Sequence, residues 1–416
     1  MDAACTYLSK RPYPPPTTID SRMRILCVFG RYNYGDPARG EGIEYSCFIP
    51  ALRALGHQVF FFESFARAGH SDFAALNRAL LKQVEVFQPD AVFTVLMMAE
   101  VWLESIALMR RAGCKVINWS TDDSWKYREF SRLIAADFDV FATTCPDALS
   151  YYAVDQIRNV HLSQWGASAA QLAEPKPARD CRYGVSFVGS AYGNRPSRIA
   201  ALCAAGVKVE CFGHGWPSGA VAAERIPEIA RDSVVSLNFS EAGNGSGLQI
   251  KARVFEVPAA GGMLLSEGAP NLEDYFSPGI EIAQFNGELQ LLTEARLLLE
   301  NSARRDSIAR AGHARAVREH TYAQRLHKLL DQLDPASAGP RAIDWPTFEK
   351  VAARHTIGWP LKLLRLFLVL PCIAAWGRER GPRAARRALF EASWRLLGRH
   401  TYTASGLPGR LFYRQS

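Results

Sequence analysis

The sequence predicts an α/β fold with two Rossmann-like lobes that face each other across a cleft, followed by a helical basic C-terminal tail. Short apolar runs alternate with helical segments through residues 23–170, and the same pattern starts again through 180–335. Such an alternation implies parallel sheets with right-handed crossovers. The chain of 416 residues is too long for one ordinary core and fits two such units.

The first lobe begins with a short apolar run that ends in glycine, which is typical of a buried parallel strand. Helical segments are expected at 43–55, through the 70s and 80s, and at 102–111. The expected strands are RILCVFG (24–30), QVFFFE (58–63), DAVFTVL (90–96), KVINWS (115–120) and DVFATT (139–144).

The second lobe repeats this order. Helices are expected near 196–205, 248–260 and 288–299, with a helical stretch up to about residue 333. The expected strands are YGVSFVG (183–189), KVECFG (208–213), SVVSLNF (233–239), GMLLSE (262–267) and IEIAQF (280–285). Ligands of open α/β sheets bind at the carboxyl ends of the strands. Two facing lobes therefore direct these ends into one cleft.

The net charge of +8 is concentrated at the C-terminal end. Residues 341–416 hold fourteen Lys and Arg against four Asp and Glu, so the rest of the chain is close to neutral. We expect no nucleic-acid partner, because the basic residues are confined to this tail and no nucleic-acid-binding motif accompanies them. Residues 1–22 contain a proline run and are expected to form a flexible leader.

Nine cysteines are scattered along the chain, and none forms a Cys-x-x-Cys pair. Scattered cysteines inside apolar runs indicate reduced, buried thiols, and they disfavour a disulfide framework or a zinc site. We therefore expect a cytoplasmic protein.

The most apolar segment lies in the tail, at 357–376, and the Arg-rich stretch follows it. Its uninterrupted apolar part is shorter than the roughly 20 residues that a spanning helix needs. We expect an in-plane amphipathic helix through 357–387 on an anionic bilayer, which would make the protein peripheral on the inner face of the cytoplasmic membrane. The alternative is a helix packed on the lobes with its arginines in solvent.

The segment N244-G-S-G-L-Q-I-K-A-R-V-F-E256 follows a strand and opens a helix. Glycines allow a ligand to approach the backbone closely, and basic residues beside them favour an anion. A carboxylate one turn further on is suited to two ribose hydroxyls. The candidate residues for binding a nucleotide of this kind are Gly245, Ser246, Gly247, Lys251, Arg253 and Glu256. The alternative is a surface loop before an ordinary amphipathic helix.

Two adjacent carboxylates, Asp122 and Asp123, follow the expected strand 115–120. Either could act as a catalytic base or orient an acceptor hydroxyl. Adjacent residues on a turn point in different directions, so we expect only one of them to face the ligand. The alternative is an ordinary helix N-cap, since Ser-Thr-Asp-Asp is a common start signal.

Two further turns follow strands. F29-G-R-Y-N-Y-G35 is not a G-x-G-x-x-G sequence, which disfavours a nicotinamide cofactor; it either shapes the acceptor pocket or is a plain loop. F212-G-H-G-W216 places His214 where it could line a nucleotide-base pocket, with a plain loop again as the alternative.

Several motifs together resemble the CgeB-like, spore-maturation-type glycosyltransferases, which have the GT-B fold and a family-4-like donor lobe. The resemblance covers about residues 24–333 and is strongest from 183 to 325. The segments that carry it are V185-S-F-V-G-S-A-Y-G-N-R195, K251-A-R-V-F-E-V-P-A-A-G-G-M-L-L-S-E267, Y275-F-S-P-G-I-E281, I308-A-R-A-G-H313 and E319-H-T-Y-A-Q-R325.

The resemblance implies that Glu256 holds the donor ribose and that Lys251 and Arg253 lie near the donor phosphates. It also implies that Gly189, Ser190 and Arg195 belong to the loop that approaches the diphosphate. One position departs from the family pattern: Leu248 stands where an acidic residue is usual, eight positions before Glu256.

We therefore expect a glycosyltransferase, hexosyl or similar, that needs no cofactor beyond its nucleotide-sugar co-substrate. We expect no metal, because basic residues and backbone amides can neutralise the leaving diphosphate. The acceptor, a hydroxyl on a glycan, a lipid-linked glycan or a protein, stays open. The alternatives are a sugar-nucleotide epimerase of the same fold and a non-catalytic, membrane-associated nucleotide-sugar-binding protein, which Leu248 favours.

Overall fold

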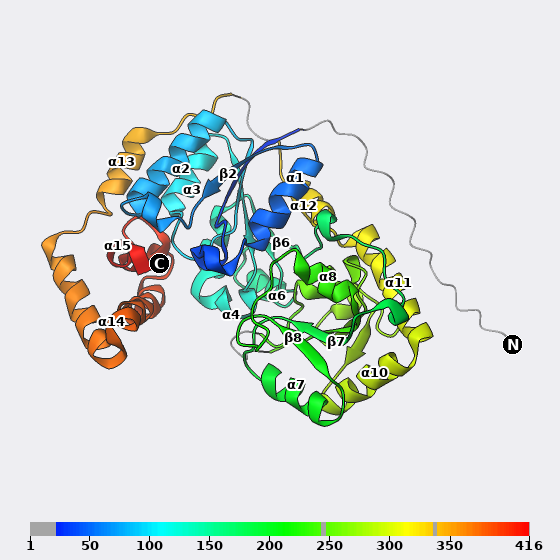
Figure 1. The fold of residues 1–416 in the computed structure, drawn as a ribbon. Coiled ribbons are helices and arrows are strands. Elements are labelled where there is room, and N and C mark those ends of the chain that lie inside the picture. Colours follow the sequence, from blue (N-terminus) through cyan, green and yellow to red (C-terminus); the bar gives the residue numbers. More distant parts are fainter. Residues whose placement is uncertain (1–21, 243–246, 336–338, 416) are drawn as a thin grey trace.

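The computed structural model describes residues 22–242, 247–335 and 339–415. Two α/β lobes lie next to each other, and the C-terminal helices pack on the outer side of the first lobe (Figure 1). The predicted fold class is confirmed: each lobe contains a parallel sheet with helices, and a long C-terminal helix follows. The expected leader lies outside the described residues except for Arg22.

The sheet of the first lobe has six parallel strands in the order β2-β1-β3-β4-β5-β6. β1, β3, β4 and β5 are buried almost throughout, because helices cover both faces of a parallel sheet. The strands are β1 (Arg24–Phe29), β2 (Gln58–Glu63), β3 (Ala91–Thr94), β4 (Lys115–Ser120), β5 (Val140–Thr143) and β6 (Val160–Leu162).

Helices of the first lobe fill the crossovers between these strands. A π-helical turn, Glu44–Phe48, leads directly into α1. The helices are α1 (Ile49–Ala54), α2 (Phe73–Phe87), α3 (Leu103–Arg111), α4 (Asp123–Lys126), α5 (Arg132–Ile134) and α6 (Ala148–Val154). The side chain of Asp72 accepts a hydrogen bond from the backbone of Ala75 and caps α2.

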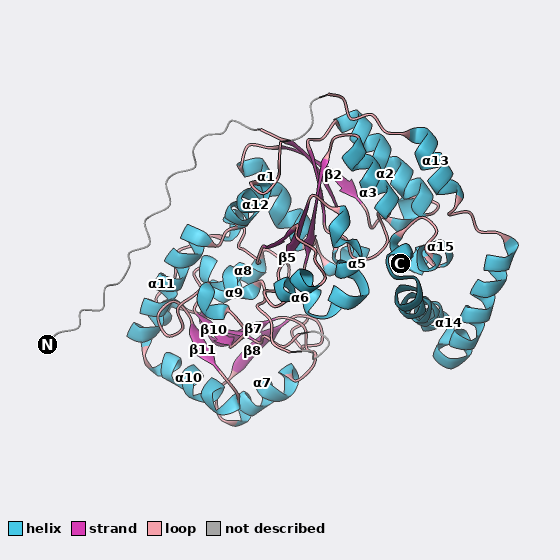
Figure 2. Cartoon of the chain, turned by 180° about the vertical axis from the view of Figure 1, so that it is seen from behind, coloured by secondary structure: helices cyan, strands magenta, loops and turns pink. Residues whose placement is uncertain are grey.

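The sheet of the second lobe has five parallel strands in the order β11-β10-β9-β7-β8. The strands are β7 (Tyr183–Val188), β8 (Val209–Phe212), β9 (Ser233–Asn238), β10 (Leu264–Glu267) and β11 (Ala283–Phe285). The helices are α7 (Arg195–Ala204), α8 (Arg225–Arg231), α9 (Arg253–Ala259), α10 (Glu288–Glu300) and α11 (Ser302–Glu319). From behind, α7 and α10 lie on one side of this sheet, with α8, α9 and α11 on the other (Figure 2).

The strand order reverses once in each lobe, between β1 and β3 and between β7 and β9. Crevices at such switch points, outside the carboxyl ends of the strands, are where open α/β sheets bind ligands. A ligand-binding site is therefore expected at the loops after β1 and β7.

The chain crosses between the lobes twice, and the two crossings pair with each other. Ala167 donates its backbone N–H to His320 (2.8 Å), and Tyr322 donates to Ala167 (2.9 Å). A Cβ at Gly166 would lie 2.9 Å from the backbone N of Tyr322, so a larger residue does not fit. α12 (Tyr322–Leu330) then packs against α1, with four of its residues in the first-lobe core. α12, which follows the second lobe in the chain, thus packs against the first lobe.

The tail is integrated into the first lobe through its own core residues. α13 (Trp345–Ala353) places Phe348 against Trp102, with ring centroids 6.4 Å apart. Tyr402 and Tyr413, near the chain end, are buried against Phe130 and Phe73. These aromatic contacts make the tail part of the fold of the first lobe.

α14 (Trp359–Leu397) consists of two helical limbs, because Gly377 has a φ of 79° and breaks the helix. The limbs pack closely at Gly381, where a Cβ would lie 2.6 Å from the backbone of Ile373. α15 (Leu407–Leu411) lies against them. Among the described residues, Trp359–Tyr402 is the one helical stretch whose length and hydropathy (1.5) would suffice to cross a bilayer.

Several elements of the lobes differ from the expectation, among them the short helices α5 and α6, for which no helix was predicted. β6 and α8 were not predicted, because the first is a short, half-exposed edge strand and the second has only two buried residues. α9 begins at Arg253 rather than near Leu248, since Gln249 donates its N–H back to Ser240 and Leu248 forms an isolated bridge with Glu241. Lys251 therefore precedes the helix.

Candidate active site in the inter-lobe cleft

A cavity of about 590 Å³ lies between the lobes at the two switch points. The first lobe contributes the loop after β1, from Asn33 to Glu41, and the start of the next helical turn. The second lobe contributes the loops after β7 and β8, the apolar segment 220–223 and α9. Five of the candidate donor-binding residues line it: Gly189, Ser190, His214, Arg253 and Glu256.

Arg253, at the start of α9, lies directly beneath the loop after β7. Its Nη1 donates to Asn238 Oδ1 (3.2 Å), and a Cβ at Gly189 would come within 2.9 Å of its Nη2. Glycine at 189 therefore lets the guanidinium reach the cavity. Gly213 is similarly required, because its φ is +131° and a Cβ there would lie 2.4 Å from the carbonyl oxygen of Gly189.

Arg195, at the start of α7, is buried beside the same loop. It donates to the carbonyl of Ser190 (3.1 Å) and to the hydroxyl of Tyr192 (2.8 Å), while its Nε is buried without an acceptor. Its first role is to hold the loop that contains Ser190, and its charge adds to that of Lys251 and Arg253.

Three cations lie close together here: the charge of Arg195 acts on both Lys251 and Arg253. Burial and then the charge of Arg195 lower the pKa of Lys251 to about 8, and the same two causes lower the pKa of Arg253 to about 10. Among the described residues no carboxylate forms an ion pair with any of the three. Uncompensated buried positive charge is costly, so this cluster is suited to bind an anion.

Glu256 lies on α9 and lines the cavity next to this cluster. Burial raises its pKa, although the charge of Arg253 acts in the opposite direction. In the described part of the chain no donor forms a hydrogen bond with its carboxylate. The carboxylate is thus available to accept hydrogen bonds from a ligand in the cavity.

The two neighbouring aspartates point in different directions. Asp123 is buried inside the first lobe, where its carboxylate accepts hydrogen bonds from the hydroxyls of Ser120 (2.6 Å), Ser131 and Tyr152 (2.8 Å). Asp122 occupies the N-cap position of α4 but makes no capping hydrogen bond, and it lies 3.5 Å from Lys126. Its charge acts on Lys251 of the other lobe, so Asp122 is the aspartate on the cleft side.

Two acidic residues near the cluster were missed at the sequence level. Glu44, in the π-helical turn, has its pKa raised by burial and by the charge of Asp122. Glu241 is bridged to Leu248 and acts electrostatically on Lys251, and one of its buried carboxylate oxygens has no partner among the described residues. Glu44 could have been identified from the sequence, because it follows the glycines of the loop after β1. Glu241 could not, because its place near Lys251 depends on the bridge to Leu248.

The remaining candidates lie at the edge of the cluster. His214 is exposed at the cavity and accepts a hydrogen bond through its carbonyl from Ala191 (2.8 Å). Gly247 is exposed with a φ of +137°, and its carbonyl accepts from Ala242 (2.8 Å). Gly245 and Ser246 lie outside the described residues.

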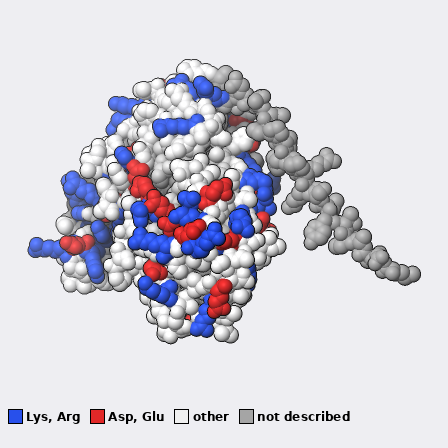
Figure 3. All heavy atoms as spheres, turned by 45° about the vertical axis from the view of Figure 1, so that its right-hand side comes forward, with Lys and Arg blue, Asp and Glu red and all other residues white. Residues whose placement is uncertain are grey.

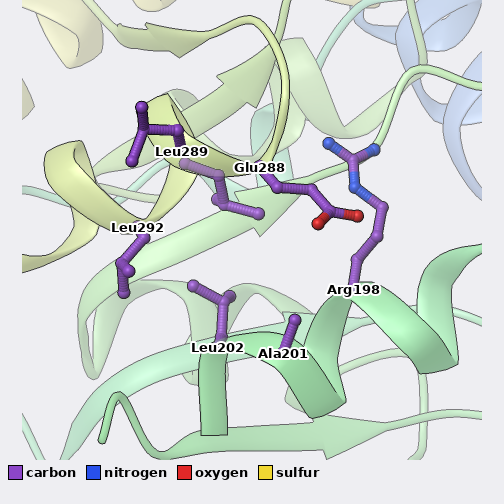
Figure 4. A pocket seen from close by; sticks show the side chains of 7 residues that line it. Arg198, Ala201, Leu202, Glu288, Leu289 and Leu292 are labelled. Atoms are coloured by element: carbon purple, nitrogen blue, oxygen red, sulfur yellow. The ribbon is translucent and has the colours of Figure 1, made fainter. Parts of the chain in front are cut away.

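A second hollow, of about 190 Å³, lies within the second lobe alone. Its lining is four leucines, Ala201 and two charged residues, Arg198 and Glu288 (Figure 4). Arg198 is already paired with Glu267 at 2.8 Å. This hollow lacks the cationic cluster found at the inter-lobe cavity.

Comparison with known proteins agrees with the geometry. Residues 196–331 match a family model described as glycosyl transferase-like. A sucrose-phosphate synthase from Thermosynechococcus elongatus superposes with a TM-score of 0.54 at 12% identity, covering 74% of this chain and 98% of that one. A glycosyltransferase from Rickettsia africae ESF-5 gives 0.52 at 10% identity, covering 75% and 97%.

The chain has the GT-B fold. AviGT4, a glycosyltransferase involved in avilamycin A biosynthesis, superposes with a TM-score of 0.50 at 14% identity and covers 74% of this chain and 96% of its own. A comparison with curated protein sequences finds no match. The domain match covers α7 to α12 of the GT-B fold and so includes Lys251, Arg253 and Glu256.

Proposed function

We propose that this protein is a glycosyltransferase that moves a sugar from a nucleotide-sugar donor, bound by the second lobe, to a hydroxyl acceptor presented by the first. The observation that carries the proposal is the cluster of Arg195, Lys251 and Arg253, which has no ion-pair partner among the described residues, beside the Glu256 carboxylate that lines the inter-lobe cavity with Arg253. The match of residues 196–331 to a glycosyl transferase-like domain supports the choice of reaction.

In this proposal each part of the donor has a place on the second lobe. Lys251, Arg253 and Arg195 bind the diphosphate, Glu256 accepts hydrogen bonds from the two ribose hydroxyls, and His214 lies toward the base. Gly189 and Ser190 let the phosphates approach the backbone. We infer the same neighbourhood for Gly245, Ser246 and Gly247, which follow β9 in sequence.

The chemical step forms a bond between the acceptor oxygen and the anomeric carbon while the bond from that carbon to the diphosphate oxygen breaks. The electron pair leaves with the diphosphate, where the three cations stabilise the growing negative charge. Asp122 accepts the proton of the acceptor hydroxyl, with Glu44 beside it. The cations supply the neutralisation that a metal ion supplies elsewhere, so we propose a metal-independent transfer of a hexosyl or similar group.

Leu248 stands where the resembled family has an acidic residue, and its side chain is 45% exposed. Glu241 lies opposite it in the bridge and has an unpartnered carboxylate oxygen. We propose that Glu241 supplies the acidic group on this side of the donor.

All eight described cysteines are free, which supports placing the reaction in the cytoplasm.

A nucleotide panel tests the donor site. UDP, GDP, ADP and their glucose derivatives are added to the full chain, and the melting temperature is measured. We expect at least one nucleoside diphosphate to raise it, and its 2′,3′-dideoxy analogue to bind about tenfold more weakly, because Glu256 loses two donors. In Glu256→Gln this preference for the ribose form should shrink.

Glu228→Gln is the matched control, since Glu228 is a surface residue of the same lobe paired with Arg225. No binding by any nucleotide would reject the donor site. If a nucleotide sugar binds, product analysis with donor alone separates the reactions: slow hydrolysis supports a transferase, whereas a donor with an inverted sugar centre would identify an epimerase instead.

The affinity for the nucleoside diphosphate should depend on pH through Lys251. Its pKa of about 8 means that it is charged below pH 8 and neutral above, so affinity should fall as the pH rises past 8. In Lys251→Arg the affinity should stay nearly constant over the same pH range, because the guanidinium keeps its charge. Titration calorimetry measures the affinity of the wild type and of Lys251→Arg across this pH range. If the affinity of Lys251→Arg fell with pH as that of the wild type does, the assignment of Lys251 would be contradicted.

A further inference from the structure

The first limb of α14 presents an apolar face that no other part of the described chain covers. Leu364, Leu368 and Val369 point inward and pack with Leu411 and Phe412 of the chain end. The opposite face carries large apolar side chains at helical spacing with a high exposed fraction: Trp359 (73%), Leu363 (44%), Leu366 (48%), Phe367 (76%) and Leu370 (59%). A contiguous exposed stripe of this kind marks an interaction surface.

Charged side chains frame this stripe without entering it. Lys362 lies at its edge, whereas Arg365 turns inward and donates to the carbonyl of Leu411 (2.9 Å). At the end of the limb an exposed Trp376 is followed by three exposed arginines: Arg378, Arg380 and Arg383. In the described chain these arginines and Lys362 form no ion pair.

We propose that the first limb of α14 docks in the plane of a bilayer that contains anionic lipids. The stripe enters the acyl boundary, Trp359 and Trp376 sit at the level of the headgroups, and Lys362, Arg378, Arg380 and Arg383 contact lipid phosphates. Arg387, further along α14, is instead paired with Glu129 (3.1 Å) and Glu391.

Two other occupants fit this surface less well. A spanning helix would have to expose its whole circumference to lipid, but the inner side is covered by α15, and from 359 to 376 the limb is only about 27 Å long. A second copy of the chain would bring the unpaired arginines of both copies together, at an electrostatic cost. The α14 limbs lie at the outer edge of the molecule, where a flat bilayer can reach them (Figure 1).

Charge elsewhere is distributed differently. Figure 3 shows basic and acidic side chains interspersed across the middle of the face that it presents, and the positive excess of residues 341–416 (fourteen Lys and Arg against four Asp and Glu) is larger than the net charge of +8 of the whole chain. This distribution makes the tail the part of the molecule that an anionic surface attracts.

Sedimentation with vesicles tests the proposal on the full chain. Phosphatidylcholine vesicles are compared with vesicles that also contain phosphatidylglycerol, and the wild type should bind the anionic vesicles at least tenfold better. The triple variant L363S/F367S/L370S and the triple variant R378Q/R380Q/R383Q should each lose about tenfold or more of this binding. Val86→Ser with Val154→Ser, at exposed apolar positions of the first lobe, should bind as the wild type does.

Quenching of tryptophan fluorescence by brominated lipids gives a second measurement. Quenching should be strongest with bromine near the headgroup and should disappear in Trp359→Phe with Trp376→Phe. Wild-type protein that stays in the supernatant would overturn the proposal, as would undiminished binding of the L363S/F367S/L370S variant or a dimer that this variant abolishes. Deletion of the tail is unsuitable, since Phe348, Tyr402 and Tyr413 complete the first-lobe core.

Discussion

Replacing Lys251 with alanine is expected to lower the affinity for the nucleoside diphosphate by about a hundredfold, or roughly 3 kcal/mol. Lys251 sits among Arg195 and Arg253 with a pKa lowered to about 8, so its charge is poorly solvated in the free protein. A diphosphate relieves this by supplying the missing counter-charge. Titration calorimetry with the nucleotide found in the panel measures the loss.

The same variant should lose even more in kcat/KM, because negative charge on the leaving diphosphate increases toward the transition state. The melting temperature of the free protein should not fall, since the substitution removes a cation from a cluster of like charges. These two outcomes together distinguish a ligand-binding lysine from a structural one.

Lys208→Ala is the matched control for Lys251→Ala. Lys208 belongs to the same lobe, its side chain is 86% exposed, and it pairs only with Glu210 (2.9 Å). Nucleotide affinity should be unchanged in this variant. Wild-type affinity in Lys251→Ala, or an equal loss in Lys208→Ala, would remove Lys251 from the donor site.

The parallel sheets and the two-lobe division could be predicted because buried parallel strands are apolar runs, and the run that opens each lobe ends in glycine. RILCVF and YGVSFV are followed by Gly30 and Gly189, and each strand is flanked by a neighbouring strand on both sides. Edge elements carry a weaker signal: β6 is three residues long and has no fully buried side chain. Local sequence also does not show that α12 returns to pack on α1, which is a contact between distant segments.

The candidate site was predictable to the extent that it lies in one segment. Lys251, Arg253 and Glu256 are close in sequence and remain close in space, whereas Glu44 and Glu241 reach the same region from the π-helical turn before α1 and the loop after β9. The start of α9 could not be predicted, because a backbone hydrogen bond from Gln249 to Ser240 keeps the preceding residues extended. The tail shows the same limit: its apolar segment is evident, but its division at Gly377 is not.

Substitution of the two adjacent aspartates should separate stability from catalysis. Asp123→Ala is expected to lower the free energy of unfolding by about 3 kcal/mol, because three buried hydroxyls, those of Ser120, Ser131 and Tyr152, lose their shared acceptor. Asp122→Asn should change it by less than about 0.5 kcal/mol, since its contact with Lys126 is partly exposed. Denaturant unfolding measures both.

The effects on turnover should be reversed: Asp122→Asn should lose turnover, and Asp123→Asn should largely keep it. Asp122→Asn keeps the shape of the side chain but removes the proton acceptor, so kcat should fall by about a hundredfold or more while nucleotide affinity is retained. In Asp123→Asn the amide oxygen can still accept hydrogen bonds from some of these three hydroxyls. The molecules of this variant that fold should therefore have a kcat close to that of the wild type. If Asp123→Asn instead folds stably and loses turnover while Asp122→Asn stays active, the base is Asp123 and the hydroxyl network positions it.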